Sequence, residues 1–412
     1  MTRIHISLFS PLVLPLLILI APVANAQQTP VDELKKWLAS DDRAAIDQQS
    51  WAKQAISKQQ AVEAKELLWN DYVEQIKADR KEEWEEQVIE LDDLKMKFEF
   101  KTFGEANETG RSLFISMHGG GGAPARVNEQ QWRNQIGLYE PEEGVYLAPR
   151  APTNTWNLWH QAHIDKFFER IIQNAVVFEG VDPNRVYIMG YSAGGDGVYQ
   201  LTPRMADRLA AAAMMAGHPN GVSPLGLRNI GFTLHMGGND AAYNRNKIAA
   251  KWKVKLADLQ KADPEGYQHE VVIYEGKGHW MDREDAVAVP WMSRFVRDPL
   301  PAKIVWHQLG VTYQQFYWLA VDDENKLAGG KVIAEVEGQT ISILETEKID
   351  RVKIRLSDEL VDMDQPIVIK VGDETISTVV PERTIGSLSR TLQERGDVNL
   401  MFSAETSVEL AK

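Results

Sequence analysis

The stretch Arg185-Val-Tyr-Ile-Met-Gly-Tyr-Ser-Ala-Gly-Gly195 joins an apolar run to a glycine-rich turn. A short apolar run bounded by turn residues indicates a buried strand. The turn matches the pattern G-x-S-x-G, in which a serine stands on a sharp strand-to-helix turn with its side chain exposed. The flanking glycines allow strained dihedral angles and a close approach of helix and strand. We therefore predict that Ser192 is a nucleophile at the end of a strand, beside the backbone N–H of Ala193.

Strands and helices alternate on both sides of this turn. Residues 94–100 alternate apolar and charged side chains, as expected of a half-buried strand. Further strands are predicted at 111–117, 144–148, 209–215, 231–236 and 270–275, and helices at about 164–178 and 248–259. This alternation indicates a mostly parallel sheet with helices on both faces. We assign residues 93–298 to this α/β domain.

The sequence pattern changes after Asp298-Pro-Leu-Pro301, where short strands separated by turn residues begin. Seven such strands and a short helix predict a small β-sandwich-like domain over residues 300–412. Phe316, Tyr317 and Trp318 are large enough for some of them to pack against the preceding domain. The expected strands are 303–308, 316–321, 331–336, 340–345, 351–356, 366–371 and 375–380, and the helix is 385–395.

Residues 27–92 precede the α/β domain and contain no glycine. Apolar side chains recur there at helical spacing, for example at Trp69, Tyr72 and Ile76. We expect two or three amphipathic helices, each packing one apolar stripe on a neighbouring part of the chain.

Residues 1–26 have the pattern of a signal peptide. A positive start at Arg3 is followed by an apolar run and by the small-residue cleavage pattern Ala24-Asn25-Ala26. We therefore expect an exported protein, periplasmic or secreted, whose mature chain begins at Gln27.

The composition excludes several classes of function. The 412 residues include no cysteine, which excludes disulfides, cysteine-ligated zinc and a thiol nucleophile. The net charge of −14 argues against nucleic-acid binding and against docking on anionic lipid. Outside the signal peptide, no segment is long and apolar enough to insert in a membrane.

A nucleophilic serine needs a histidine base and an acid that orients it, and in this kind of sheet they follow in the order serine, acid, histidine. Asp240 ends the loop Gly237-Gly-Asn-Asp after a predicted strand, which is the usual position of the acid. His279 lies in a loop just after the last strand of the sheet, whereas His269 precedes that strand. We predict a catalytic triad of Ser192, Asp240 and His279.

The loop His118-Gly-Gly-Gly-Gly122 follows an earlier strand. Backbone N–H groups can approach a developing oxyanion closely where no side chain obstructs them. We expect the amides of Gly120, Gly121 and Ala193 to form an oxyanion hole.

A tryptophan-rich loop, residues 152–163, precedes one of the predicted helices. Its aromatic side chains could wall a substrate pocket, or they could pack rigidly beneath the loop. His218-Pro-Asn220 also follows a strand and should lie near the site. The candidate substrate contacts are Trp156, Trp159, His160 and Trp280.

With these motifs, residues from about 94 to 297 resemble an α/β-hydrolase. They are similar to secreted bacterial esterases of the polyhydroxybutyrate-depolymerase and feruloyl-esterase type, on the stretches HGGGG, GYSAGG, MGGND and GKGHW. The resemblance implies a serine esterase that uses a catalytic triad, forms an acyl-enzyme, needs no cofactor and acts on a small or polymeric ester; no metal site is expected. The helical segment, the β-domain and the lack of cysteine depart from that pattern.

Two other functions stay open from the sequence. A serine peptidase of the prolyl-oligopeptidase-like kind has the same triad order, but the N-terminal helices cannot form the β-propeller typical of that family. A polymer- or carbohydrate-binding protein with a vestigial hydrolase domain is the other alternative. The oligomeric state is not predicted.

Overall fold

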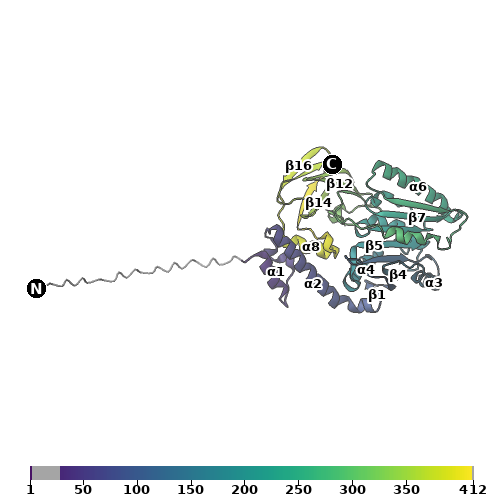
Figure 1. Ribbon diagram of the computed structural model, residues 1–412. Helices are drawn as coiled ribbons and strands as arrows, with labels where there is room; N and C mark the ends of the chain where they lie inside the picture. Colours follow the sequence, from purple (N-terminus) through teal and green to yellow (C-terminus); the bar gives the residue numbers. More distant parts are fainter. Residues whose placement is uncertain (2–27, 411–412) are drawn as a thin grey trace.

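The computed structural model describes Met1 and residues 28–410. Apart from Met1, the predicted signal peptide therefore lies outside the described residues. Within them, no helix combines the length and the apolar character needed to cross a membrane. Figure 1 shows the N-terminal helices running beneath both the large sheet and the smaller C-terminal sheets.

An eight-stranded sheet forms the centre of the molecule, in the order β1-β2-β4-β3-β5-β6-β7-β8. β2 runs antiparallel to its neighbours, and the strands from β4 to β8 pair in parallel. The strands are β1 Val88–Leu91, β2 Leu94–Phe103, β3 Arg111–Met117, β4 Gly144–Arg150, β5 Val181–Tyr191, β6 Ala211–Met215, β7 Gly231–Gly237 and β8 His269–Tyr274.

Successive side chains of the strands point to opposite sides of this sheet, and on the central strands both sets are buried. Ile115 and Ile188 contribute to one apolar cluster, and Phe114 and Tyr187 contribute to the other. Helices α4, α5 and α6 cover the first face, and α3 and α7 cover the second. Their bounds are α3 Ala125–Ile136, α4 Ala162–Glu179, α5 Ala193–Arg204, α6 Arg245–Ala262 and α7 Ala288–Met292. The predicted α/β-hydrolase fold is confirmed.

The N-terminal segment forms two helices, α1 Pro30–Leu38 and α2 Lys58–Glu85. Both begin with a capping box, at Thr29 and at Ser57, which satisfies N–H groups that have no partner inside the helix. β1 follows and forms a hairpin with β2, so the expected boundary at 92/93 falls in the turn of this hairpin.

Two smaller sheets and one helix follow the α/β part. The five-stranded sheet has the order β16-β15-β13-β12-β9, and the four-stranded sheet has the order β10-β11-β14-β17. The elements are β9 Lys303–His307, β10 Gln315–Phe316, β11 Leu319–Ala320, β12 Lys331–Glu337, β13 Thr340–Glu347, β14 Arg351–Leu356, β15 Ile367–Val371, β16 Glu374–Val379, α8 Ile385–Arg395 and β17 Ala404–Glu409.

This arrangement fits the expected small sandwich-like domain, with two differences. The strand expected over 316–321 is a tight hairpin of β10 and β11 that turns at Tyr317, whose φ is 53°. The last strand, β17, was not predicted, and it pairs with β14 at the edge of its sheet.

Buried ion pairs join the C-terminal part to the part that contains the large sheet. The carboxylate of Asp397 forms ion pairs with Arg208 and Arg297, at 2.9 and 2.8 Å, and all three side chains are at most 2% exposed. Tyr317 donates its hydroxyl to the carbonyl of Ala206 at 3.0 Å. The two parts therefore share a buried polar interface instead of being joined by a free linker.

Helix α2 contacts both parts at once. Its first turns pack with α1 and α8 in an apolar cluster that includes Leu68 and Leu388. Near its end, Glu83 forms an ion pair with Arg170 of α4 at 2.9 Å. The N-terminal segment thus connects the α/β part to the C-terminal part.

Candidate active site

Ser192 lies between β5 and α5 in a strained backbone conformation, with φ 58° and ψ −117°. Its N–H donates to the carbonyl of Met215 on the neighbouring strand at 2.9 Å, which holds the turn in place. A side chain on Gly194 would overlap the carbonyl of Met117, so glycine is needed for α5 to approach β3. The turn thus has the strand–turn–helix geometry that G-x-S-x-G requires.

The structure brings Ser192, Asp240 and His279 together in one hydrogen-bonded chain. His279 Nε2 lies 2.9 Å from Ser192 Oγ, and His279 Nδ1 lies 2.7 Å from Asp240 Oδ2. Because the carboxylate only accepts, Nδ1 carries the proton and Nε2 is left to accept from the serine. The Asp240 side chain is 2% exposed, whereas that of His279 is 44% exposed, so the imidazole is accessible from solvent.

Tyr191, next to the serine, holds the loop of His279. Its hydroxyl donates to the carbonyl of His279 at 2.7 Å and accepts from the N–H of Met281 at 3.0 Å. Its ring also packs against Trp280, with ring centroids 5.4 Å apart. Sequence reasoning missed this role, although Tyr191 occupies the variable position before the serine in the G-x-S-x-G motif.

Two of the three expected oxyanion donors are free. Within residues 28–410, the amides of Gly120 and Ala193 have no hydrogen-bond partner. The expectation for Gly121 is corrected, because its N–H donates to Asn128 Oδ1 at 3.0 Å. Gly120 has a φ of 111°, and a side chain there would overlap Asn128, so this position requires glycine.

Asn128 of α3, which sequence reasoning did not identify, fixes the shape of the glycine loop. The side chain is fully buried. Its Nδ2 donates to the carbonyl of Gly121 and to Asn154 Oδ1, both at 3.0 Å, while its Oδ1 accepts from the Gly121 amide. Asn128 thus uses both backbone groups of Gly121, while Gly120, which also lines the pocket with Ser192, keeps an unpaired amide.

His118 anchors the start of the same loop. Its Nδ1 donates to the carbonyl of Gly119 at 2.6 Å, and its Nε2 accepts from the N–H of Ala151 at 3.2 Å. Burial lowers the pKa of the imidazole to about 3. The ring is therefore neutral at ordinary pH, which is the only state in which Nε2 can accept.

The four expected substrate contacts occupy different positions. Trp156 is 64% exposed and lines the pocket beside Ser192. Trp280 is 48% exposed and follows His279 directly in the chain. The expectation for Trp159 is corrected, because this side chain is fully buried and donates to the carbonyl of His118 at 2.9 Å. His160 packs edge-on against Trp156 and is not part of the pocket lining.

A pocket of 480 Å³ opens at the serine. His218 and Asn220 form part of its wall, as expected, and both are held by Asp196, which accepts from the N–H of His218 at 2.6 Å and from Asn220 Nδ2 at 3.1 Å. The lining residues are Gly120, Gly121, Gly122, Ala123, Trp156, Ser192, Ala193, Asp196, His218, Asn220, Tyr243 and Arg245.

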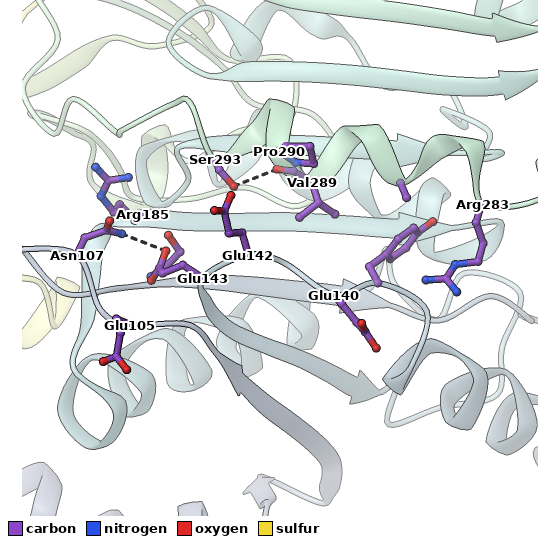
Figure 2. Close-up of a pocket in the computed structure, with 13 residues that line it drawn as sticks. Glu105, Asn107, Glu140, Glu142, Glu143, Arg185, Arg283, Val289, Pro290 and Ser293 are labelled. Carbon is purple, nitrogen blue, oxygen red and sulfur yellow. Dashed lines mark hydrogen bonds between the residues drawn. The ribbon is translucent and has the colours of Figure 1, made fainter.

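A larger hollow of 870 Å³, shown in Figure 2, lies near the amino-terminal ends of β3 and β4, away from Ser192. Four of its 13 lining residues are glutamates from loops, and one of them, Glu143, is bonded to Asn107 and to the N–H of Ser112. Open sheets of this class bind ligands at the carboxyl ends of their strands, where the serine pocket lies. In residues 28–410, no three acidic or histidine side chains are grouped as a metal would require.

No family model matches this sequence, and no curated protein matches it. Several solved structures match about half of the chain. A thermostable esterase is 18% identical over 51% of this chain and 62% of its own length, with a TM-score of 0.38. Thermogutta terrifontis esterase 2 is 18% identical over 50% of this chain and 89% of its own, with a TM-score of 0.35. A feruloyl esterase module from Clostridium thermocellum, complexed with sinapinate, is 14% identical over 49% of this chain and 83% of its own, with a TM-score of 0.36.

Proposed function

We propose that this protein is a serine hydrolase that cleaves carboxylic esters through an acyl-enzyme. One observation carries the proposal: the chain of hydrogen bonds from Asp240 through His279 to Ser192 ends on a strained turn. Gly120 and Ala193, whose amides are unpaired, line the same pocket as Ser192. A nucleophile, an oriented base and unpaired donors are the three parts that acyl transfer needs.

In the first half of the reaction, Ser192 Oγ forms a bond to the acyl carbon while His279 Nε2 takes the hydroxyl proton. The carbonyl oxygen becomes negative and accepts hydrogen bonds from the amides of Gly120 and Ala193. When the tetrahedral intermediate collapses, the bond to the alcohol oxygen breaks and His279 returns the proton to that oxygen. Asp240 holds the imidazole in the required tautomer and stabilises its positive charge.

In the second half, a water molecule replaces the alcohol. His279 removes a proton from the water as the oxygen attacks the acyl carbon, and the same two amides hold the oxyanion. Collapse releases the carboxylic acid and returns the proton to Ser192 Oγ. Each donor of such a hole contributes about 3–4 kcal/mol of transition-state stabilisation in comparable sites.

The specific test is a screen of chromogenic esters of different acyl length, a feruloyl ester and a peptide amide, with the wild-type protein and Ser192→Ala. We expect the wild type to cleave esters and the variant to lose that activity while keeping its fold. Faster cleavage of the amide than of every ester would favour the peptidase. Binding of a polymer without any ester cleavage would favour the binding protein.

A further inference from the structure

Two basic side chains in residues 28–410 lie within ion-pair distance of Asp240: His279 and Arg245. They face different oxygens of the carboxylate. His279 Nδ1 is bound to Oδ2 at 2.7 Å, and Arg245 Nη1 lies 3.8 Å from Oδ1. Over the same residues, Asp240 is the one carboxylate within ion-pair distance of Arg245. The acid of the expected triad therefore lies between its base and a guanidinium that has no other ion-pair partner there.

The turn that leads into α6 holds Arg245 close to the acid. Arg245 is the first residue of α6, and the N–H of the next residue, Asn246, donates to the carbonyl of Asp240 at 3.0 Å. Tyr243 and Asn244, which precede α6, have φ values of 55° and 58°. Asparagine tolerates this left-handed conformation, but a bulky tyrosine rarely adopts it. Strain of this kind persists only where the surrounding contacts impose it, and it gathers at functional sites.

The guanidinium of Arg245 is enclosed in the wall of the serine pocket. The side chain is 12% exposed, and its central carbon lies 4.9 Å from the centre of the Tyr243 ring. Its Nε is buried and has no hydrogen-bond partner in residues 28–410. A cation that is largely withdrawn from water needs a negative charge close by. Asp240 supplies that charge, so the two groups constrain each other.

We propose that Arg245 is a positioning residue that acts through Asp240. It fixes the carboxylate so that Oδ2 faces His279, and its positive charge opposes protonation of the imidazole. A protonated His279 and Arg245 would have to share one carboxylate, and a nearby like charge disfavours the charged form of a group. The imidazole is thereby kept in the state that can accept the proton of Ser192. This inference rests on the proposed function, because it assigns a role within the same triad.

Other titratable groups surround the triad, and the carboxylates among them act in the opposite direction to Arg245. A negative charge close to an imidazole favours its protonated form. The nearby lysine, Lys277, is already paired with Asp282 at 2.8 Å. Burial raises the pKa of Asp196, while its hydrogen bonds and the charge of Arg245 oppose that rise. The groups are Tyr191 at the end of β5, Asp196 of α5, His218 after β6, Tyr243 and Arg245 at the start of α6, and Lys277, Asp282, Glu284 and Asp285 around the loop of His279.

The test compares a neutral variant, a charge-conserving variant and a matched control. The neutral variant is Arg245→Gln, and Arg245→Met, which fills the volume of the buried stem, replaces it if the glutamine variant does not fold. Arg245→Lys keeps the charge without the planar fork. The control is Arg294→Gln: Arg294 also lies over an aromatic ring, at 5.4 Å from the centre of Trp291, but no carboxylate in residues 28–410 lies within ion-pair distance of it.

Two measurements are made on each full-length protein. The first is the pH dependence of kcat and KM for 4-nitrophenyl acetate, a neutral ester. The second is an NMR titration of the His279 imidazole in protein labelled with ¹³C-histidine, with the signal assigned by its absence in His279→Asn. The NMR titration requires no turnover, so it reports on His279 whether or not the protein cleaves an ester.

We expect the neutral variant to raise the midpoint of the His279 titration, and the acid limb of kcat/KM, by about 0.5 to 1 pH unit relative to the wild type. Its activity should therefore fall more at about pH 5.5 than at about pH 8. On the alkaline plateau, kcat should fall about 3- to 10-fold with KM unchanged, less than the roughly 100-fold cost of a 1 Å displacement. Arg245→Lys should restore the midpoint but only part of kcat, and the control should match the wild type throughout.

An unchanged NMR midpoint in the neutral variant overturns the inference even if kcat falls, because a loosened pocket alone would lower kcat. It is also overturned if Arg245→Lys keeps the shifted midpoint of the neutral variant, since the charge would then not be the cause. A KM that rises only for an anionic ester such as 4-nitrophenyl hemisuccinate, with the midpoint unchanged, would assign Arg245 to substrate binding instead. A wild type that cleaves no ester contradicts the proposed function, and the NMR titration then still decides whether Arg245 controls the protonation of His279.

Discussion

Asn128 binds both backbone groups of Gly121 and so fixes the glycine loop that lines the pocket beside Ser192. In Asn128→Asp, the side chain keeps its size but loses the Nδ2 donors to Gly121 and Asn154, and it places a negative charge beside the developing oxyanion. Misplacing reacting groups by about 1 Å can cost about 100-fold in rate. We expect kcat for a small ester to fall about 10- to 100-fold with little change in KM.

The control for this prediction is Asn134→Asp, which makes the same chemical change at an exposed position of α3. Its steady-state kinetics should match those of the wild type. If Asn128→Asp raised KM and left kcat unchanged, Asn128 would act on ground-state binding and not on the oxyanion loop.

His118 should make the stability of the fold sensitive to acid. Its pKa is about 3 in the folded chain and about 6.5 when unfolded, so between these values the unfolded state binds the extra proton. The free energy of unfolding therefore falls as the pH is lowered from about 7, and this group alone accounts for about 2 kcal/mol at pH 5.

His118→Asn keeps a donor and an acceptor at this position but cannot titrate. We expect its free energy of unfolding, measured with denaturant, to fall about 2 kcal/mol less than that of the wild type between about pH 7.5 and pH 5. Identical pH dependence in the two proteins would show that the imidazole is not held neutral.

At the scale of elements, the contact between α5 and β3 depends on Gly194. A methyl group there would overlap the carbonyl of Met117, which belongs to the sheet and cannot move aside easily. We expect Gly194→Ala to destabilise the protein by several kcal/mol or to prevent folding. Gly137→Ala, at the end of α3, adds the same methyl group in open space and should leave the melting temperature nearly unchanged. A similar melting temperature for both variants would contradict the tight packing of the turn.

The strands and helices of the α/β part could be predicted because their apolar periodicity is strong. β17 escaped prediction because its sequence, Ala404–Glu409, is mostly polar and small, and its pairing with β14 comes from tertiary contacts. The turn at Tyr317 could not be predicted either, since an aromatic residue rarely adopts a positive φ.

The site residues that belong to a sequence motif could be predicted. The residues of the expected triad follow strand ends, so chain order and turn position were sufficient to choose them. Asn128 and Tyr191 act by binding backbone groups, of Gly121 and of the His279 loop, and no motif marks this role in either residue. One signal for Asn128 was available: it shares a helical face with Trp132 and Gln135, at spacings of four and seven residues, which places a polar side chain on the buried side of α3.

At the scale of the whole molecule, Asp397 connects the C-terminal part to the α/β part through two buried ion pairs. Replacing it with asparagine leaves Arg208 and Arg297 buried without their shared negative charge. Removing one partner of a buried pair typically costs about 3–5 kcal/mol. We expect Asp397→Asn to lose about that much stability in denaturant unfolding, while Asp323→Asn, which breaks a surface pair of the same domain, changes little.

The same interface should affect the stability of a truncated chain. A fragment ending at Asp298 would contain every expected catalytic residue, but it would lack Asp397 and expose the surface that Tyr317 covers. We expect the fragment to be far less stable than the full chain. A fragment with the wild-type melting temperature would show that the interface does not contribute to the stability of the α/β part.

The most direct test of the account is whether Ser192 carries the acyl group during turnover. The protein is mixed with a chromogenic ester, and the released alcohol is followed in the first turnover while quenched samples are analysed by mass spectrometry. The account predicts a burst of alcohol, at most equal to the enzyme concentration, together with an acyl mass on the peptide that contains Ser192; Ser192→Ala should show neither. Ester turnover that persists in Ser192→Ala, or an acyl group found on another residue, would contradict it.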